Sequence, residues 1–131
     1  MQEYKLRPIK FLWQLLNKSI SEAKVYILGY RSYIAILNQS GTTAPVATVL
    51  ENTLGSTFKW NYAGVGKYYV ESIGTFTPNK TVVITGTPDK PGFFRKLITS
   101  VDSIDLQVFA TNASLIDNNL AGTYIEIRVY N

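Results

Sequence analysis

The sequence predicts a mainly β protein: an antiparallel β-sandwich, jelly-roll or immunoglobulin-like, of about seven or eight strands with a short N-terminal amphipathic helix. Three observations favour this class. After residue 24 the chain is rich in valine, isoleucine, threonine, tyrosine and phenylalanine, which suit strands. Glycine, proline, asparagine and aspartate interrupt these runs at intervals typical of turns. No long helical pattern separates the runs, so a doubly wound parallel sheet is not expected.

The 131 residues fit one folded domain preceded by a short arm. We expect residues 1–24 to form an N-terminal docking arm and residues 25–131 to form the β-sandwich domain. The charges support this division. Residues 1–24 contain five basic and two acidic residues, whereas residues 25–131 contain eight and seven. The net charge of +4 therefore belongs mostly to the arm.

The arm is predicted to contain an amphipathic helix over residues 8–18. Pro8 suits a first helical turn, where the missing N–H costs nothing. Apolar residues then recur at intervals of three and four, which places them on one helical face. They are the candidate partner-docking residues Ile9, Leu12, Trp13, Leu16 and Ile20. This face can dock on a partner protein or a membrane surface, or pack on its own sheet.

The strands are expected in sequence order over residues 25–37, 46–50, 58–62, 67–73, 81–87, 93–99, 104–108 and 124–130. The last run is the clearest, because Ile125, Ile127 and Val129 alternate with polar or amphipathic residues. Ile104 and Val108 belong to a similar alternating run. Each of these two runs should bury one face.

Turn residues separate these strands. Ser40-Gly41 permits a positive φ, and Gly64-Val65-Gly66 is interpreted as a short hairpin rather than a phosphate loop, since no helix follows it. Residues 88–92 give the strongest turn signal, with two prolines, an aspartate and a glycine. Residues 112–122 are expected to form the longest loop, unless residues 113–118 form a helical turn.

The chain contains no histidine and no cysteine. Zinc sites, iron–sulfur clusters, disulfides and His-dependent nucleophilic sites are therefore not expected. Carboxylate pairs such as Asp102 and Asp105 are the remaining catalytic route, and their spacing matches ordinary turn and strand residues. We expect a protein that is not an enzyme and that uses no cofactor or metal.

Aromatic residues make up 13% of the chain. Trp60, Tyr62, Tyr68 and Tyr69 cluster in the first half of the body and are candidate ligand-stacking residues. The alternative is that they are ordinary sheet aromatics, which strands favour. Few basic residues lie among the rings, so no specific nucleic-acid partner is expected.

Residues 33–55, YIAILNQSGTTAPVATVLENTLG, followed by Trp60, Gly66 and a Tyr-containing strand, form a recognisable segment. The segment resembles a strand–turn–strand unit in small proteins encoded by tailed bacteriophages and prophages of Bacteroidetes-type bacteria. The resemblance covers about residues 30–75 and carries no site residues across. It implies a virion structural protein, such as a capsid decoration, head-fibre or tail-associated protein. Such a protein is made in the host cytoplasm and resides in the virion.

The function expected from the sequence is docking through the arm and display of the β-sandwich, with other virion proteins as partners. A homo-oligomer is expected, and a trimer is suggested by capsid and fibre geometry rather than by any residue. The alternative is a carbohydrate- or receptor-binding module that takes a host-surface glycan on exposed aromatic rings. A third reading is a membrane-surface or nucleic-acid binder that uses the basic arm.

Overall fold

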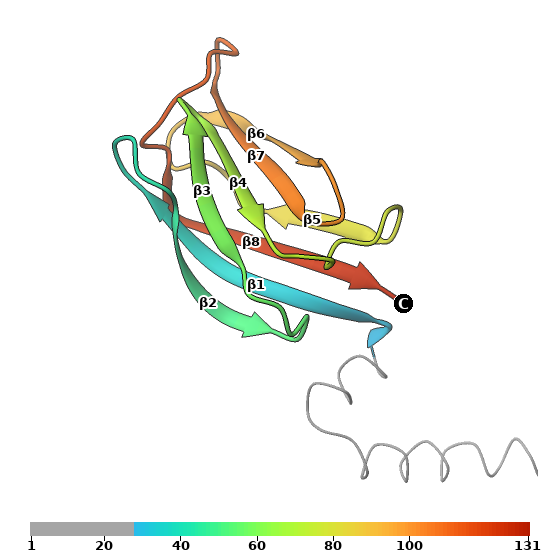
Figure 1. Ribbon diagram of the computed structural model, residues 1–131. Coiled ribbons are helices and arrows are strands. Elements are labelled where there is room, and N and C mark those ends of the chain that lie inside the picture. Colours follow the sequence, from blue (N-terminus) through green and yellow to red (C-terminus); the bar gives the residue numbers. More distant parts are fainter. Residues whose placement is uncertain (1–27) are drawn as a thin grey trace, which may run out of the picture.

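The computed structural model describes residues 28–131, so the expected helix and the five candidate docking residues lie outside the described part (Figure 1). Apart from Leu28, which is helical, every element within it is a β-strand. The strands are β1 (Tyr30–Gln39), β2 (Val46–Asn52), β3 (Lys59–Gly64), β4 (Lys67–Glu71), β5 (Thr81–Thr85), β6 (Gly92–Ile98), β7 (Ser103–Ala110) and β8 (Leu120–Tyr130). All eight expected strands are present, and their ends differ from the expected ones by up to five residues.

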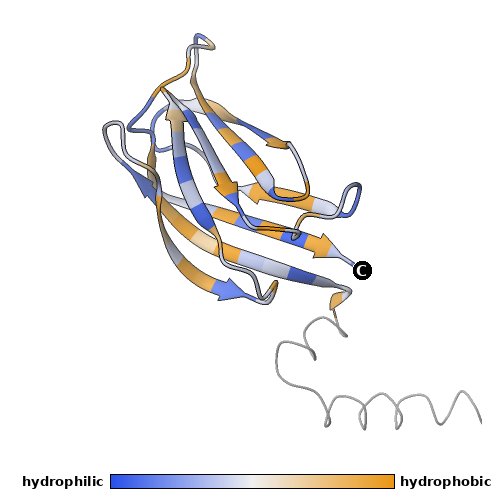
Figure 2. Cartoon of the chain, in the orientation of Figure 1, coloured by the Kyte–Doolittle hydropathy of each residue, from blue (hydrophilic) through white to orange (hydrophobic). Residues whose placement is uncertain are grey.

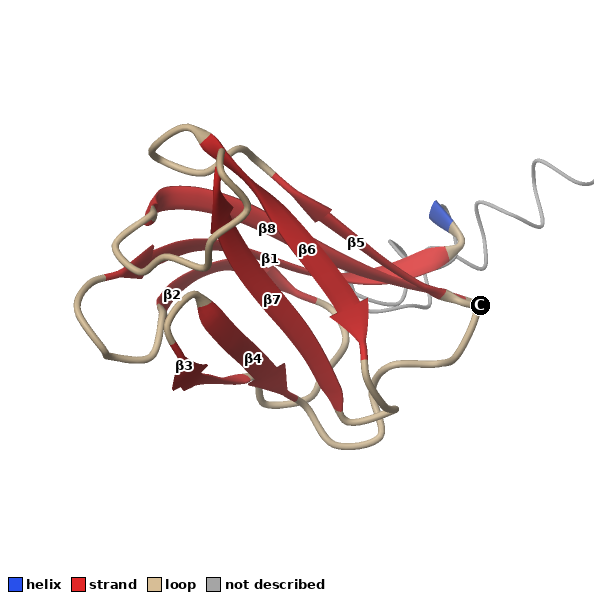
Figure 3. Ribbon diagram, turned by 90° about the horizontal axis from the view of Figure 1, so that it is seen from above, coloured by secondary structure: helices blue, strands red, loops and turns tan. Residues whose placement is uncertain are grey.

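The strands form two four-stranded sheets in which every pairing is antiparallel. Sheet A has the order β2-β1-β8-β5, and sheet B has the order β3-β4-β7-β6. The two sheets lie against each other as two layers (Figure 3). A mainly β, antiparallel architecture is therefore confirmed. The finer class, jelly-roll or immunoglobulin-like, stays a prediction. In the constant-type immunoglobulin order the first strand lies at a sheet edge, whereas β1 lies between β2 and β8.

Alternating side chains from the interior strands build the core between the sheets (Figure 2). On β8 the inward residues are Ile125, Ile127 and Val129, which are at most 2% exposed. Ile104 and Val108 on β7 are equally buried. Both alternating runs therefore bury the face that the sequence predicted, because strand side chains point alternately to opposite sides.

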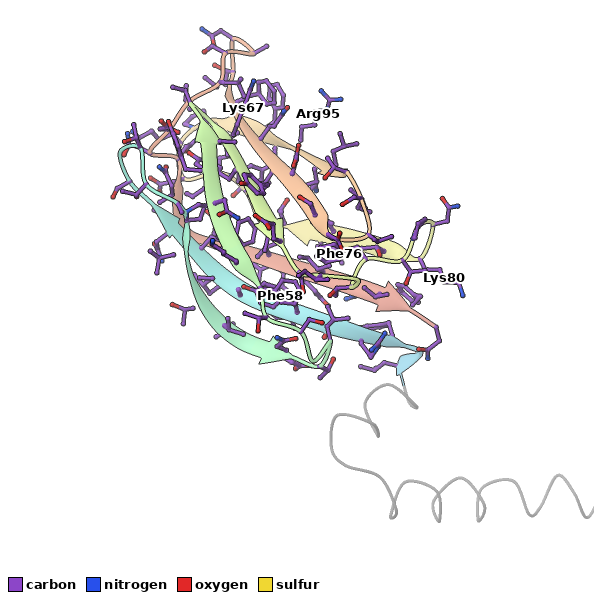
Figure 4. The ribbon with its side chains drawn as sticks, in the orientation of Figure 1. Phe58, Lys67, Phe76, Lys80 and Arg95 are labelled. Atoms are coloured by element: carbon purple, nitrogen blue, oxygen red, sulfur yellow. The ribbon has the colours of Figure 1, made fainter. Side chains whose placement is uncertain are left out.

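Aromatic rings close one region of this core. The rings of Tyr33 and Phe58 stack with centroids 3.9 Å apart, and Phe58 meets the edge of Phe76 at 5.9 Å. Figure 4 labels Phe58 and Phe76 in the lower part of the molecule. Tyr33 belongs to sheet A, while Phe58 and Phe76 lie in the segments before β3 and after β4. These contacts help to join connecting segments to the packed layers.

The expected boundaries change at three places. The strand expected over residues 25–37 begins at Tyr30, because Leu28 is helical and Gly29 bends the chain, while residues 25–27 lie outside the described part. The strand expected to reach residue 73 ends at Glu71, because the chain turns at Gly74, whose φ is 65° and whose N–H donates to Asp102 Oδ1 at 2.6 Å. The expected loop over 112–122 is shorter, since β8 already begins at Leu120. Residues 113–118 form bends and a single bridge rather than a helical turn.

The start of β1 and the end of β8 lie together. Tyr30 pairs with Tyr130, and the N–H of Asn131 donates to the carbonyl of Gly29 at 3.1 Å. The β1–β2 and β3–β4 turns lie at the opposite end of the molecule (Figure 1). The arm therefore joins the body at the end that carries Asn131.

Candidate functional site

Two of the four candidate stacking rings are core residues. Trp60 is 8% exposed and Tyr68 is 1% exposed. The indole N–H of Trp60 donates to the Tyr33 hydroxyl at 3.2 Å across the core. Trp60 pairs with Val70 on β4, and paired residues share a face, so the indole points inward with that buried valine. Neither ring offers a free face to a ligand, which corrects the prediction for these two positions.

Tyr62 and Tyr68 belong to a hydrogen-bonded group around Asp117, which we call the Asp117 cluster. The Tyr62 hydroxyl donates to Asp117 Oδ2 at 2.8 Å, and the Gly66 N–H donates to Oδ1 at 2.8 Å. The Tyr68 hydroxyl lies 2.7 Å from Asp117 Oδ1 and 2.9 Å from Gln39 Oε1. The cluster fastens the β7–β8 loop to the β3–β4 hairpin and to the end of β1. Tyr62 is thus held by its polar end.

The environment keeps Asp117 ionised and its tyrosine neighbours protonated. Burial opposes ionisation of Asp117, but donated hydrogen bonds from Gly66, Tyr68 and Tyr62 outweigh it, so its pKa lies below the ordinary value. The pKa of Tyr68 is raised by burial and by its contact with Asp117. A carboxylate with a lowered pKa and three donors is a weak proton acceptor. The cluster is therefore suited to holding a loop rather than to acid–base chemistry.

Tyr69, the fourth candidate ring, lies on the outer face of sheet B. Its register partners are Asn61 on β3 and Asp105 on β7, which form one row across the sheet. The next row consists of Lys67, Gln107 and Arg95. Directly paired residues point to the same side, so both rows share one surface. We call this surface the Tyr69 face; its ring and polar members are Asn61, Lys67, Tyr69, Arg95, Asp105 and Gln107, and the exposed Leu97 of β6 lies beside Asp105 in the same row.

Most side chains of the Tyr69 face have no partner within residues 28–131. Tyr69, Asp105 and Gln107 are half-buried on the two interior strands of sheet B, yet their polar ends bind no other described group. Lys67 and Arg95 are exposed and also unpaired there. Asn61 is the exception, because its amide donates to Glu71 Oε1 at 3.0 Å. The face thus carries, around one ring, several donors and acceptors that no other group of the described part uses.

The outer face of sheet A carries similar residue types with their partners supplied internally. Glu126 is only 6% exposed and accepts hydrogen bonds from Tyr124 and from Arg128 Nε, each at 2.6 Å. The Arg128 guanidinium lies over the Tyr30 ring, 4.6 Å from its centroid. The Arg128 hydrogen bond lowers the pKa of Glu126 although burial opposes it. We call this group the Glu126 network. In this network the polar groups have partners on the same sheet, whereas most polar side chains of the Tyr69 face have none within residues 28–131.

The sequence did not indicate Asp117, Asp105 or Gln107 as functional partners of the tyrosines. Asp117 lies 49 residues from Tyr68 and 55 from Tyr62, so no local spacing links them. Alternation along residues 104–108 does place Asp105 and Gln107 on the outward side. The identity of their neighbours depends on which strands pair.

No family model, curated protein or solved structure matches this chain. Residues 28–131 contain no group of three or more acidic, His or Cys residues able to hold a metal ion. No helix in that same part is long and apolar enough to span a bilayer.

Proposed function

We propose that the chain is a non-enzymatic virion structural protein, a capsid decoration, head-fibre or tail-associated protein. It docks through its N-terminal arm and displays the two-sheet body. The resemblance over about residues 30–75 supports the virion assignment. The observation that carries the display role is that residues 33–129 supply a core drawn from both sheets. Such a body is suited to presentation on an arm whose apolar face packs elsewhere.

In this proposal the arm residues Ile9, Leu12, Trp13, Leu16 and Ile20 enter a groove on another virion protein. Buried Trp and Leu side chains dominate interface energies when they fill pockets. The protein is made in the host cytoplasm and works in the assembled particle. No specific nucleic acid is among its partners, and the finer fold class, jelly-roll or immunoglobulin-like, belongs to the same proposal.

The proposal includes a homo-oligomer, with a trimer as the expected state. The edge strand β2 supports contact between copies, because Val46 is 69% exposed, Leu50 is 62% exposed and Val49 is also exposed. Residues 46–50 carry no charge, so copies can approach there without repulsion. Light scattering should give three times 14.7 kDa for the purified chain, and a monomer mass contradicts the trimer.

The docking role is tested with one change on each face of the predicted helix. Leu12→Asp places a charge on the apolar face, whereas Gln14→Asp places the same charge on the polar side. We expect Leu12→Asp to be absent from purified virions and Gln14→Asp to be incorporated normally. Circular dichroism should show the same β-body for both variants. Normal incorporation of Leu12→Asp contradicts docking through the arm.

A second candidate function is a carbohydrate- or receptor-binding β-module, with a host-surface glycan as the partner. The unpartnered polar side chains around Tyr69 favour it. Tyr69 provides an aromatic surface, and the surrounding groups provide directional hydrogen bonds. Virion docking and ligand binding use different parts of the chain, so both functions can belong to one displayed protein.

A further inference from the structure

We infer that the Tyr69 face binds a saccharide that carries a carboxylate group; this inference rests on the second candidate function. Three features of the face support it: the central ring, the planar polar groups beside the ring, and the two cations in the next row that have no partner within residues 28–131. Each feature selects a different part of the ligand.

The central ring selects a flat, partly apolar group. Tyr69 is half-buried on β4, an interior strand, with Asn61 on one side and Asp105 on the other. A tyrosine held between neighbours presents an apolar body and a polar tip at low entropic cost. The C–H face of a pyranose fits such a ring, and its hydroxyl groups remain at the rim.

The planar polar groups select a ligand rich in hydroxyls. Asp105 accepts hydrogen bonds when ionised, and Gln107 both donates and accepts. Asp105 has no donor partner within residues 28–131, although it is half-buried. Sugar hydroxyls can donate to a carboxylate and accept from an amide at the same time. A phosphate dianion has no such donors, and an acidic peptide, although it has backbone N–H groups, brings a carboxylate on each acidic side chain close to Asp105.

The two cations select a negative group on that ligand. Lys67 and Arg95 flank Gln107 from the two adjacent strands, about 10 Å apart at their backbones from the usual strand spacing. Their row is displaced by two residues, about 7 Å, from the row of Tyr69. Long Lys and Arg side chains span that distance, and Arg binds carboxylates with two parallel hydrogen bonds. Figure 4 shows Lys67 and Arg95 near the same upper end of sheet B.

The inference is tested with the full-length chain on an array of uronate- and sialate-bearing oligosaccharides, each printed beside its neutral methyl ester. Affinities for hits are then measured in solution by NMR titration. We expect the acidic forms to bind about tenfold more tightly than the esters. Tyr69→Ala should abolish binding to both forms. Lys67→Ala and Arg95→Ala should each remove most of the preference for the acid.

Lys80→Ala is the matched control, because Lys80 is an exposed lysine away from this face (Figure 4). We expect it to bind as the wild type does. The inference is overturned if no saccharide on the array binds, if the esters bind as well as the acids, or if polyglutamate competes equally. Virion incorporation of Tyr69→Ala separates the two proposals. Normal incorporation without any glycan hit rejects the site and leaves arm docking intact.

Discussion

Asp117 connects parts of the chain that are far apart in sequence. Its two carboxylate oxygens accept hydrogen bonds from Tyr62, Gly66 and the nearby hydroxyl of Tyr68. When such a carboxylate is protonated or replaced by an amide, one of its two acceptor oxygens becomes a donor group, and the bonds that remain lose the strength that the negative charge gives them. The β7–β8 loop is also held by Asn118, which bonds Gln39 and Gly41, and by Asn119, which bonds the segment before β6. Asp117 is thus one of several residues that fix this loop, and it also orients the two tyrosine rings.

Replacing Asp117 tests this role. Asp117→Asn should lower the free energy of unfolding at pH 7 by about 1 kcal/mol, the lower end of the loss for a buried group that loses a partner, because Asp117 is half-buried and Asn keeps one acceptor oxygen. The native pKa of Asp117 lies below its unfolded value of about 3.9, so its stabilisation is present above that pH. It is lost as the pH falls from about 4 through the native pKa.

Urea denaturation at pH 7 and at several pH values between about 2 and 5 measures this effect. The variant should lose part of the acid dependence that the wild type shows. Asp105→Asn is the control, since the Asp105 carboxylate has no partner within the described part, and it should change stability by less than about 0.5 kcal/mol. Equal losses for the two variants refute the role given to Asp117.

At the scale of elements, the positions of the strands could be predicted from the sequence, but which strands pair with one another could not. Alternation along residues 104–108 and 124–130 is a local signal, so strand existence and the buried face follow from the sequence. Tyr68 and Tyr69 necessarily point to opposite sides of β4. Which of them enters the core depends on how β4 pairs with β3 and β7, a relation between distant residues. The Asp117 cluster was missed for the same reason.

The β3–β4 hairpin is tightly fitted to the loop that it contacts, and two glycines allow a matched test. Gly66 and Gly74 have nearly equal φ values of 64° and 65°. A Cβ at Gly66 lies 2.7 Å from both the Ile116 nitrogen and the Val108 oxygen, whereas a Cβ at Gly74 meets nothing within 4 Å. Gly74→Ala should cost about 1–2 kcal/mol for the left-handed backbone alone. Gly66→Ala should cost about 1–3 kcal/mol more, because backbone atoms must move.

Urea midpoints of the two variants measure the difference directly. Equal destabilisation by both substitutions contradicts the close approach of the hairpin and the loop. The Gly66→Ala variant should also weaken the Asp117 cluster, because the Gly66 N–H is one of its donors. Combining Gly66→Ala with Asp117→Asn should therefore cost less than the sum of the two single changes.

Across the whole molecule, the two sheets depend on one shared core. Tyr33 of sheet A receives a hydrogen bond from Trp60 of sheet B, and buried residues of both sheets form one cluster. Neither sheet can bury its inward face alone. The body should therefore unfold as one cooperative unit.

Trp60 makes this prediction measurable. Trp13→Phe removes the other tryptophan, so fluorescence then reports on Trp60 in the core. We expect the fluorescence transition and the far-ultraviolet circular dichroism transition to coincide in urea. Two separate midpoints show instead that the sheets unfold independently, which contradicts the shared core.

The ladder between β1 and β8 also decides how the body carries mechanical load. The two strands pair from Tyr30 with Tyr130 to Gln39 with Leu120, and the arm enters at the Tyr30 end. Tension between the arm and the loops at the far end acts along the axis of β1. The force is then shared by all hydrogen-bonded pairs between β1 and β8 at once. Tension between the arm and Asn131 instead breaks the hydrogen-bonded pairs of β1 and β8 one after another, starting at Tyr30 and Tyr130. A body anchored by its arm and gripped at its distal loops is therefore pulled in its stronger direction.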